Sequence, residues 1–430
     1  MTANQASPAQ AALPGPEAAA ARWHRMRTET AGYALLLLGG AAAAVLAMAL
    51  PAMASPVTGH AAAGTRSISA ILKAGDIVTG VRGTTDGNVI LTGSDATGDG
   101  TNTLPFLYQG PLIGATEDSG FHALHPPFAG FATGTFYGPD TSTYNPDTIP
   151  AGQVRAVGSY RDGDGVANHG MIYLGPAGGG GSWTPIDVPP DGSNTAGGVR
   201  ACPSGQPGCM VMDTIAHSTM GNLVVGNYDL NLGNGVSGNA FIYNMATGQW
   251  TLLQLGGSLA SGTTLYGIWQ NGGPGSPNYT LAGGSSAHLS SLRTQRAFLM
   301  NYNERTGRFG PPRFYSYGNA PAALTHFDGI TKVPGGFNLA TISSARQSST
   351  ALQPSMAFIP ATGGNWPLFG RATWYPIDVA HSSLCTALPA TSCSRVTANT
   401  VYQNQVMGLY VQQQQSGSVP GSYLATVSTR

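Results

Sequence analysis

Two neighbouring Asp and His pairs are the residues of this chain best suited to acid–base chemistry. Asp213 and His217 occur in the segment DTIAHSTM, and His326 and Asp328 occur in THFDGITKV. A carboxylate near an imidazole can transfer protons in a hydrolase or a lyase, and both groups can hydrogen-bond a polar ligand. A hydrogen-bonded pair with a purely structural role is the alternative. We take these four residues as candidate ligand-binding residues.

Alignment with similar segments makes two of the four residues exceptional. The column of His217 is otherwise filled by Gly80, Gly267 and Gly329, and the column of Asp213 contains Asp76, Thr263 and Thr325. Positions where a repeated pattern is broken are candidates for a site, because packing alone does not require the exception. This alignment favours a site at Asp213 and His217.

Trp269 is the third candidate for ligand binding. It lies in YGIWQNGG, two residues after the glycine column and just before a Gly-rich loop. An aromatic ring at the mouth of a loop is a good stacking surface for a sugar ring. The alternative is a tryptophan of the core or of a rim.

Metal binding has weak support from acidic turns. Carboxylates and amides about two residues apart can ligate calcium through oxygen, but the full twelve-residue calcium loop with its closing Glu is absent. Asp and Gly are also the ordinary residues of hairpin turns, so we expect no cofactor, with calcium as the alternative. The acidic turns contain Asp95 and Asp99, Asp162 and Asp164, and Asp229 with Asn231 and Asn234.

Several other chemistries lack their residues. The chain has no G-x-S-x-G nucleophile elbow and no Gly-rich phosphate loop. After the N-terminal region its only glutamates are Glu117 and Glu304, so a glycosidase would more readily use Asp. Lysine occurs only at Lys73 and Lys332, and no basic cluster is present, so the sequence predicts no nucleic-acid partner.

The N-terminal region is typical of an export signal. Three arginines precede an apolar run that ends in Ala-Met-Ala at Ala54. We expect cleavage after Ala54, residues 55–66 as a linker, and a secreted or periplasmic protein. An uncleaved membrane anchor is the alternative, because the run is long enough to span a bilayer. No later segment has that length and polarity.

The four cysteines form two local pairs. Cys202 and Cys209 enclose six residues, and Cys385 and Cys393 enclose seven. In an oxidising compartment such pairs form small disulfide-closed loops. Zinc sites use other spacings, and no His pair lies nearby.

A repeated phrase predicts the architecture that holds these residues. A small residue, a large apolar residue and a short strand recur 57 to 70 residues apart, each time after two apolar strands and before another. Six units of four short strands indicate a six-bladed all-β propeller over residues 67–430. The sixth unit lacks its fourth strand, and an extra strand at Ser67–Leu72 can complete it. Five or seven blades, a β-solenoid and a sandwich remain alternatives. The large apolar residues of the six units are Phe106, Met171, Phe241, Phe298, Phe358 and Tyr423.

The same phrases resemble a known family. GNLVVGNY, GNAFIYN and GQWTLL are similar to bacterial exported HAF-type repeats, in which a His/Ala-Phe strand follows a G-x-x-V-G strand, and His stands at the expected place only in NHGMIY. The resemblance covers most of residues 67–430 and implies an exported propeller-like domain, but no particular reaction.

Low charge and many Asn, Gln, Ser, Thr, Tyr and Trp residues suit a neutral polar ligand. The sequence therefore favours an exported propeller that binds an extracellular carbohydrate or cell-surface polymer where its loops converge. The alternatives are a secreted hydrolase or lyase using Asp and His at the channel, and a scaffold that joins envelope proteins through its rim.

Overall fold

The computed structural model is almost entirely β-sheet over the residues that it describes. These are residues 64–96, 102–163, 167–202, 204, 208–231, 236–255, 262–285, 296–319, 324–344, 352–386, 392–414 and 417–429. Helical turns within them are limited to η2 (Ala196–Gly198), η3 (Tyr317–Asn319) and α2 (Ser383–Thr386). No helix among these residues has the length and polarity needed to cross a bilayer. The predicted signal, residues 1–54, lies outside them.

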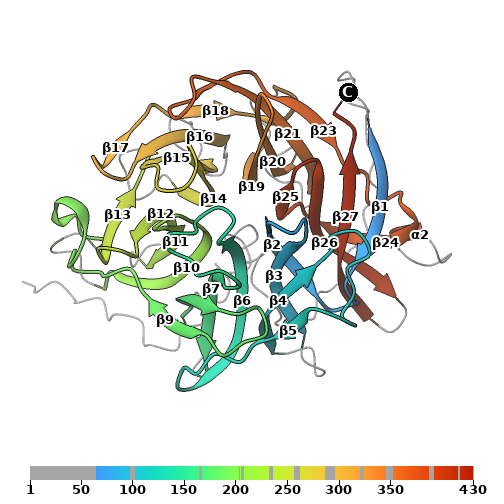
Figure 1. Cartoon of the computed structure of the whole chain (residues 1–430), viewed down its shortest axis with the longest axis horizontal. Helices are drawn as coiled ribbons and strands as arrows, with labels where there is room; N and C mark the ends of the chain where they lie inside the picture. The colour runs from blue at the N-terminus through green and yellow to red at the C-terminus, as the bar shows by residue number, and fades with distance from the viewer. Residues whose placement is uncertain are drawn as a thin grey trace, which may run out of the picture. The chain divides into compact units, whose positions relative to one another are not determined.

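Six antiparallel sheets are arranged as blades around a central axis (Figure 1). Blades one and two consist of β2 (Ile77–Gly83), β3 (Val89–Ala96), β4 (Thr103–Gly110) and β5 (Phe121–Ala123), then β6 (Phe131–Thr141), β7 (Val154–Asp162), β8 (His169–Gly175) and β9 (Ser182–Ile186). Blade three consists of β10 (Met210–Met220), β11 (Leu223–Asn231), β12 (Val236–Asn244) and β13 (Gln249–Leu253).

Blades four and five each contain a further short strand. They consist of β14 (Thr263–Asn271), β15 (Asn278–Ser285), β16 (Arg296–Asn303), β17 (Arg308–Phe309) and β18 (Arg313–Tyr315), then β19 (Leu324–Val333), β20 (Gly336–Ser344), β21 (Gln353–Thr362), β22 (Leu368–Phe369) and β23 (Thr373–Pro376). The innermost strands contact one another in order around the ring, and β25 of blade six contacts β2 of blade one. The predicted six-bladed propeller is confirmed.

The two ends of the domain meet in blade six. It consists of β24 (Ser392–Val396), β25 (Thr400–Tyr402), β26 (Gln405–Gln414), β27 (Gly417–Val427) and, as the outermost strand, β1 (Thr65–Ile71). Ala70 of β1 lies opposite Tyr423 of β27. The predicted N-terminal closing strand is therefore confirmed, and it covers a sheet edge that would otherwise be open.

A Gly–aromatic pair explains why the phrase repeats. In five blades a glycine of the second strand lies opposite the large residue of the third strand, as Gly93 does with Phe106 and Gly226 with Phe241. A Cβ at Gly93 would lie 2.6 Å from the Phe106 ring, and one at Gly226 would lie 2.7 Å from the Phe241 ring. The large ring therefore requires the glycine, and both are buried between sheets.

Blade five solves the same packing problem differently. The residue opposite the glycine position is Ser355, three residues before the predicted Phe358, and the glycine is replaced by Thr341. The hydroxyl groups of Thr341 and Ser355 are in hydrogen-bond contact. A smaller third-strand residue thus permits a larger second-strand residue, and Phe358 is only half-buried.

Both predicted disulfides are present. Cys202 bonds to Cys209 and Cys385 bonds to Cys393, with Cα–Cα distances of 5.7 and 5.4 Å. Cys385 lies in the apolar cluster of blades five and six, so its bridge joins a short loop to the core.

Candidate functional site

Each innermost strand presents one irregular residue near the axis. In five blades a β-bulge interrupts the pairing of the first and second strands at the same place. A bulge leaves one residue outside the ladder and redirects its side chain. The residues at these positions are Thr79, Tyr137, His217, Tyr266 and Asp328, and Asn399 occupies the matching position between β24 and β25.

This register corrects the sequence alignment by one residue. His217 corresponds to Tyr266 and Asp328, and the glycines predicted for its column correspond instead to Ser218. The Thr and Asp residues predicted for the column of Asp213 likewise correspond to Thr214. The exceptional position is therefore the whole bulge column, which differs from blade to blade, and not His217 alone.

The bulge residues of blades two to five form a continuous row with His326. The ring centroids of Tyr137 and His217 are 4.9 Å apart, those of His217 and Tyr266 are 4.4 Å apart, and those of Tyr266 and His326 are 5.1 Å apart. His326 Nδ1 lies 3.6 Å from Asp328 Oδ1. We call these five residues the channel row. It brings three of the predicted residues, His217, His326 and Asp328, into one chain of contacts.

Burial sets the protonation of the channel row. It lowers the pKa of His217 to about 3, and His326 adds to this effect, so His217 is neutral. Burial raises the pKa of Tyr137 to about 12 and raises that of Tyr266 further, with the charges of Asp328 and Asp229 adding to the second. Burial also raises the pKa of Asp328, against the opposing effect of His326. Near neutral pH the row thus holds His217 as a neutral imidazole and Tyr137 and Tyr266 as neutral phenols, which are forms suited to hydrogen bonding.

Asp213, in contrast, has a structural role. Its Oδ1 accepts hydrogen bonds from the backbone N of Asn168 at 2.8 Å and from Asn168 Nδ2. It therefore ties blade three to blade two. Asp229 lies directly opposite Asp213 on β11, and burial raises the pKa of Asp229 to about 7, with Asp213 adding to the rise. The hydrogen bonds from Asn168 agree with the structural alternative for Asp213. Trp269, whose exposed fraction is 7%, is likewise part of the apolar core.

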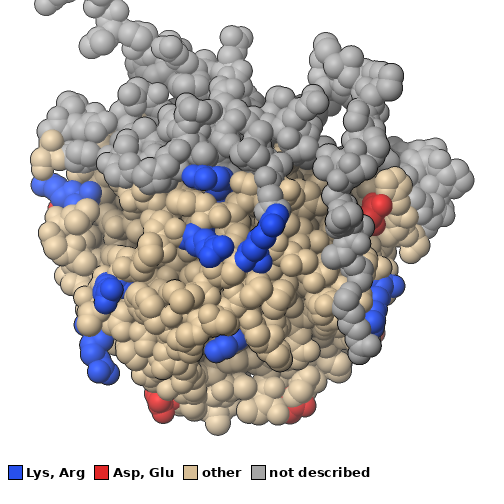
Figure 2. Space-filling model, turned by 90° about the horizontal axis from the view of Figure 1, so that it is seen from above, with Lys and Arg blue, Asp and Glu red and all other residues tan. Residues whose placement is uncertain are grey.

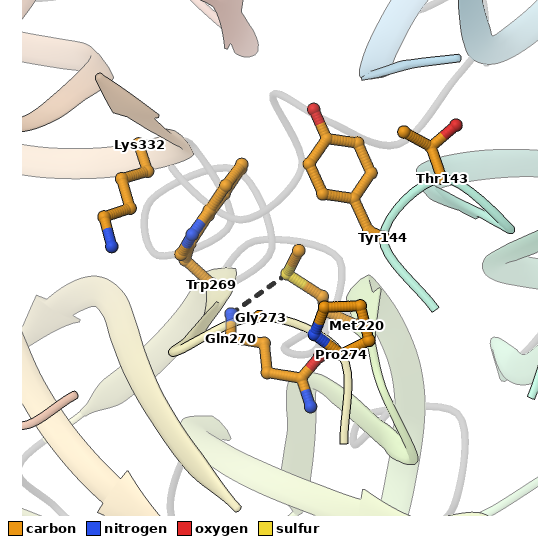
Figure 3. A pocket seen from close by; sticks show the side chains of 8 residues that line it. All are labelled: Thr143, Tyr144, Met220, Trp269, Gln270, Gly273, Pro274 and Lys332. Atoms are coloured by element: carbon orange, nitrogen blue, oxygen red, sulfur yellow. Dashed lines mark hydrogen bonds between the residues drawn. The ribbon is translucent and has the colours of Figure 1, made fainter. Parts of the chain in front are cut away.

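Trp269 lines a pocket near the C-terminal ends of the inner strands β10, β14 and β19. The pocket has a volume of about 240 Å³. Its residues come from the last positions of β10, β14 and β19 and from the segment after β6, so four blades contribute (Figure 3). The lining residues are Thr143, Tyr144, Met220, Trp269, Gln270, Gly273, Pro274 and Lys332.

An aromatic pair forms the wall of this pocket. The rings of Tyr144 and Trp269 are nearly perpendicular, with centroids 5.5 Å apart. Arg82, from blade one, places its guanidinium carbon 5.3 Å from the Trp269 centroid and 5.6 Å from the Tyr144 centroid. Arg82 is itself held by a 3.2 Å hydrogen bond from Nε to the Pro139 carbonyl. Contact with Arg82 therefore holds the Tyr144 and Trp269 rings in place in the unliganded protein.

One cluster of three acidic side chains among the described residues has the spacing of a metal site. Oxygens of Asp76, Asp95 and Glu117 lie within 4.8 Å of one another. Lys73 Nζ lies 2.6 Å from Glu117 Oε1 and 3.2 Å from Asp95 Oδ1, so its ammonium offsets part of the negative charge of the cluster. Burial raises the pKa of Asp76 to about 8, with Glu117 adding to the rise. Asp99, the calcium partner proposed for Asp95, is outside the described residues, as are Asp164 and Asn234.

Sequence reasoning missed the partners of the predicted residues. Tyr137 and Tyr266 belong to the same bulge column as His217, but a bulge leaves no mark in the strand pattern. Tyr144 and Arg82 come from other blades than Trp269, and only closure of the ring brings them together. Among the pocket residues that sequence reasoning missed, Lys332 has a signal, because lysine is rare in this chain.

Solved structures with a similar chain path include carbohydrate-active enzymes. An α-L-arabinofuranosidase from Fusarium graminearum in complex with an iminosugar inhibitor has a TM-score of 0.46 and 10% identity, covering 82% of this chain and 93% of that chain. An α-L-arabinanase from Penicillium chrysogenum complexed with arabinobiose has a TM-score of 0.36 and 8% identity, with the same coverage. The WD40 domain of SCAP from fission yeast has a TM-score of 0.28 and 8% identity, covering 87% and 97%.

No protein-family model and no curated protein matches the chain. No residue role in this chain follows from the similarities to solved structures.

Proposed function

We propose that this chain is an exported propeller that binds a saccharide in the Trp269 pocket. The observation that carries the proposal is the aromatic pair of Tyr144 and Trp269 at the axial end of the ring, held by Arg82. Sugar rings present apolar C–H faces that pack on aromatic rings, and their hydroxyls need polar groups nearby. Thr143 and Gln270 lie in the pocket wall and supply such groups.

The extracellular setting of the proposal has separate support. Two disulfides in the described residues are typical of proteins from oxidising compartments. Export through the N-terminal segment, with cleavage after Ala54, is part of the same proposal. Cell fractionation followed by N-terminal sequencing of the mature protein tests it, and a cytosolic chain that begins at Met1 would contradict it.

Binding is tested with residues 55–430 on a panel of neutral and acidic oligosaccharides, followed by titration calorimetry. Tyr144→Ala should weaken a binding sugar about ten-fold, because it removes half of the aromatic wall. Tyr144→Phe keeps the ring and serves as the matched control. A panel without any ligand, or equal affinity for Tyr144→Ala and the parent, would refute the proposal.

A second function has one specific observation in its favour. His326 and Asp328 are close together in the channel row, beside Tyr266, and burial raises the pKa of Asp328. A carboxyl group whose pKa is raised by burial, close to an imidazole and a phenol, suits hydrolytic or eliminative cleavage of a polysaccharide. Reducing-end and unsaturated-product assays test this function. Turnover that is lost in Asp328→Asn and kept in Tyr144→Ala would place chemistry in the channel row.

A further inference from the structure

Positive charge is concentrated in one part of the exported chain. Residues 296–376 contain seven Arg or Lys and two Asp or Glu, whereas the rest of residues 55–430 contains nine Arg or Lys and fifteen Asp or Glu. Both acidic groups of the basic part face other residues. Asp328 is in the channel row, and Glu304 accepts hydrogen bonds from Asn244 and Tyr279 at 2.9 and 3.1 Å. The arginines of this part therefore have few acidic residues of the same part to pair with.

The exposed arginines gather on the outer rim of blades four and five. Figure 2 views the ring from the side of β16, β18 and β21, and Lys and Arg side chains are spread over this face while Asp and Glu lie toward its margins. The loop between β21 and β22 adds Trp366, which is half-buried, and β22 adds Leu368, whose exposed fraction is 72%. We call the following residues the arginine rim: Arg305, Arg308, Arg313, Arg371, Trp366 and Leu368.

Contacts across the blade boundary make the rim one surface. Arg308 places its guanidinium carbon 5.8 Å from the Trp366 ring centroid, and Arg313 Nη1 donates a hydrogen bond to the Phe369 carbonyl. Asn301 Nδ2 donates to the Pro367 carbonyl at 2.9 Å. These bonds hold the blade-five loop against blade four.

The loop itself is fixed so that one apolar side chain points outward. β22 pairs with β21, and the backbone N of Gly370 donates to the Pro360 carbonyl at 2.6 Å. Pro367 and Phe369 are buried, so the strand alternation leaves Leu368 between them exposed. The exposed Leu368 adds an apolar side chain to the arginine-bearing surface.

We propose that the arginine rim docks on the anionic lipid surface of the cell envelope. Arginine guanidinium groups bind lipid phosphates, and a leucine with a neighbouring tryptophan inserts at the boundary of headgroups and acyl chains. An anionic polysaccharide would satisfy the arginines but offers no apolar phase for Leu368. This role is separate from the Trp269 pocket, which shares no residue with the arginine rim and is lined by the inner strands and their loops.

Vesicle sedimentation with residues 55–430 tests the proposal. That chain keeps every described strand and lacks the apolar N-terminal run. It should bind phosphatidylglycerol–phosphatidylcholine vesicles and not pure phosphatidylcholine vesicles, and added salt should release it. Arg308→Gln with Arg371→Gln should weaken binding about 25-fold, at about five-fold for each charge. Leu368→Ser should weaken it by about five-fold without changing the salt dependence.

Two control variants lie outside blades four and five. Ile113→Ser removes an equally exposed apolar side chain, at 75% exposure, and Arg200→Gln removes an exposed charge from the segment between β9 and β10. Both should bind vesicles like the parent. Absence of binding to phosphatidylglycerol vesicles, or equal losses in the controls, would overturn the proposal. Binding to soluble polygalacturonate that Leu368→Ser leaves intact, without vesicle binding, would overturn it in favour of an acidic polymer.

Discussion

Replacing Asp229 with Asn should change how stability depends on pH. Asp229 faces Asp213 directly across β10 and β11, and burial raises the pKa of Asp229 to about 7 from an ordinary 3.8. Between pH 3.8 and about pH 7, Asp229 is therefore protonated in the folded state and ionised in the unfolded state. The free energy of unfolding must fall as pH rises through this window, by about 1.4 kcal/mol per pH unit at most, or up to about 4 kcal/mol in total.

Asp229→Asn removes this titration. Urea unfolding of the variant and the parent should be compared from pH 4 to pH 8. The variant gains stability relative to the parent as pH rises to about 7, and the difference is then constant. Its absolute value includes the cost of a buried amide, so the change with pH is the quantity to measure. Asp213→Asn keeps an acceptor for Asn168 but removes the negative charge that faces Asp229. The pKa of Asp229 should therefore fall, and the pH range over which stability changes should become narrower. If the free energy of unfolding of the variant minus that of the parent is constant from pH 4 to pH 8, or falls as pH rises, the reasoning is refuted.

Three further changes test the ring itself. Replacing Cys385 and Cys393 with Ser opens an eight-residue loop and should lower the free energy of unfolding by about 2.5 kcal/mol, seen as a lower urea midpoint. In Gly283→Ala the new Cβ would lie 1.8 Å from a carbonyl oxygen of β14, so stability should fall by about 3 kcal/mol, whereas Gly163→Ala, with its nearest atom at 3.8 Å, should have little effect. Deleting residues 64–71 should expose the edge of β27, with a lower melting temperature and self-association in size-exclusion chromatography.

The fold was predictable because one steric problem is repeated in nearly every blade. The Gly–aromatic pair, such as Gly226 with Phe241, leaves a clear trace in the sequence. Blade five shows the limit of that signal. There the partners are Thr341 and Ser355, so the sequence pattern pointed to Phe358, three residues away. A compensated pair keeps the fold and removes the motif.

The site was only partly predictable, for a reason of geometry. Trp269 could be selected because it stands alone before a Gly-rich loop, but its partners Tyr144 and Arg82 come from blades that are distant in sequence. The bulge shifted the predicted columns by one residue, because two residues oppose one and the alternation of faces is interrupted. Exceptions in a repeat therefore identify the right strand more securely than the right residue.

The bulge also explains why polar residues can vary so freely at the axis. A regular inner-strand residue is paired in the strand register with a residue of the second strand, whereas the bulged residue is left out of that register. Blade one uses Thr79 there, whose hydroxyl donates to the Phe136 carbonyl of blade two, and blade six uses Asn399, whose amide donates to the Val78 carbonyl of blade one at 2.9 Å. In blades one and six the bulged residue therefore hydrogen-bonds to the neighbouring blade. In blades three to five the same position holds His217, Tyr266 and Asp328, which belong to the channel row.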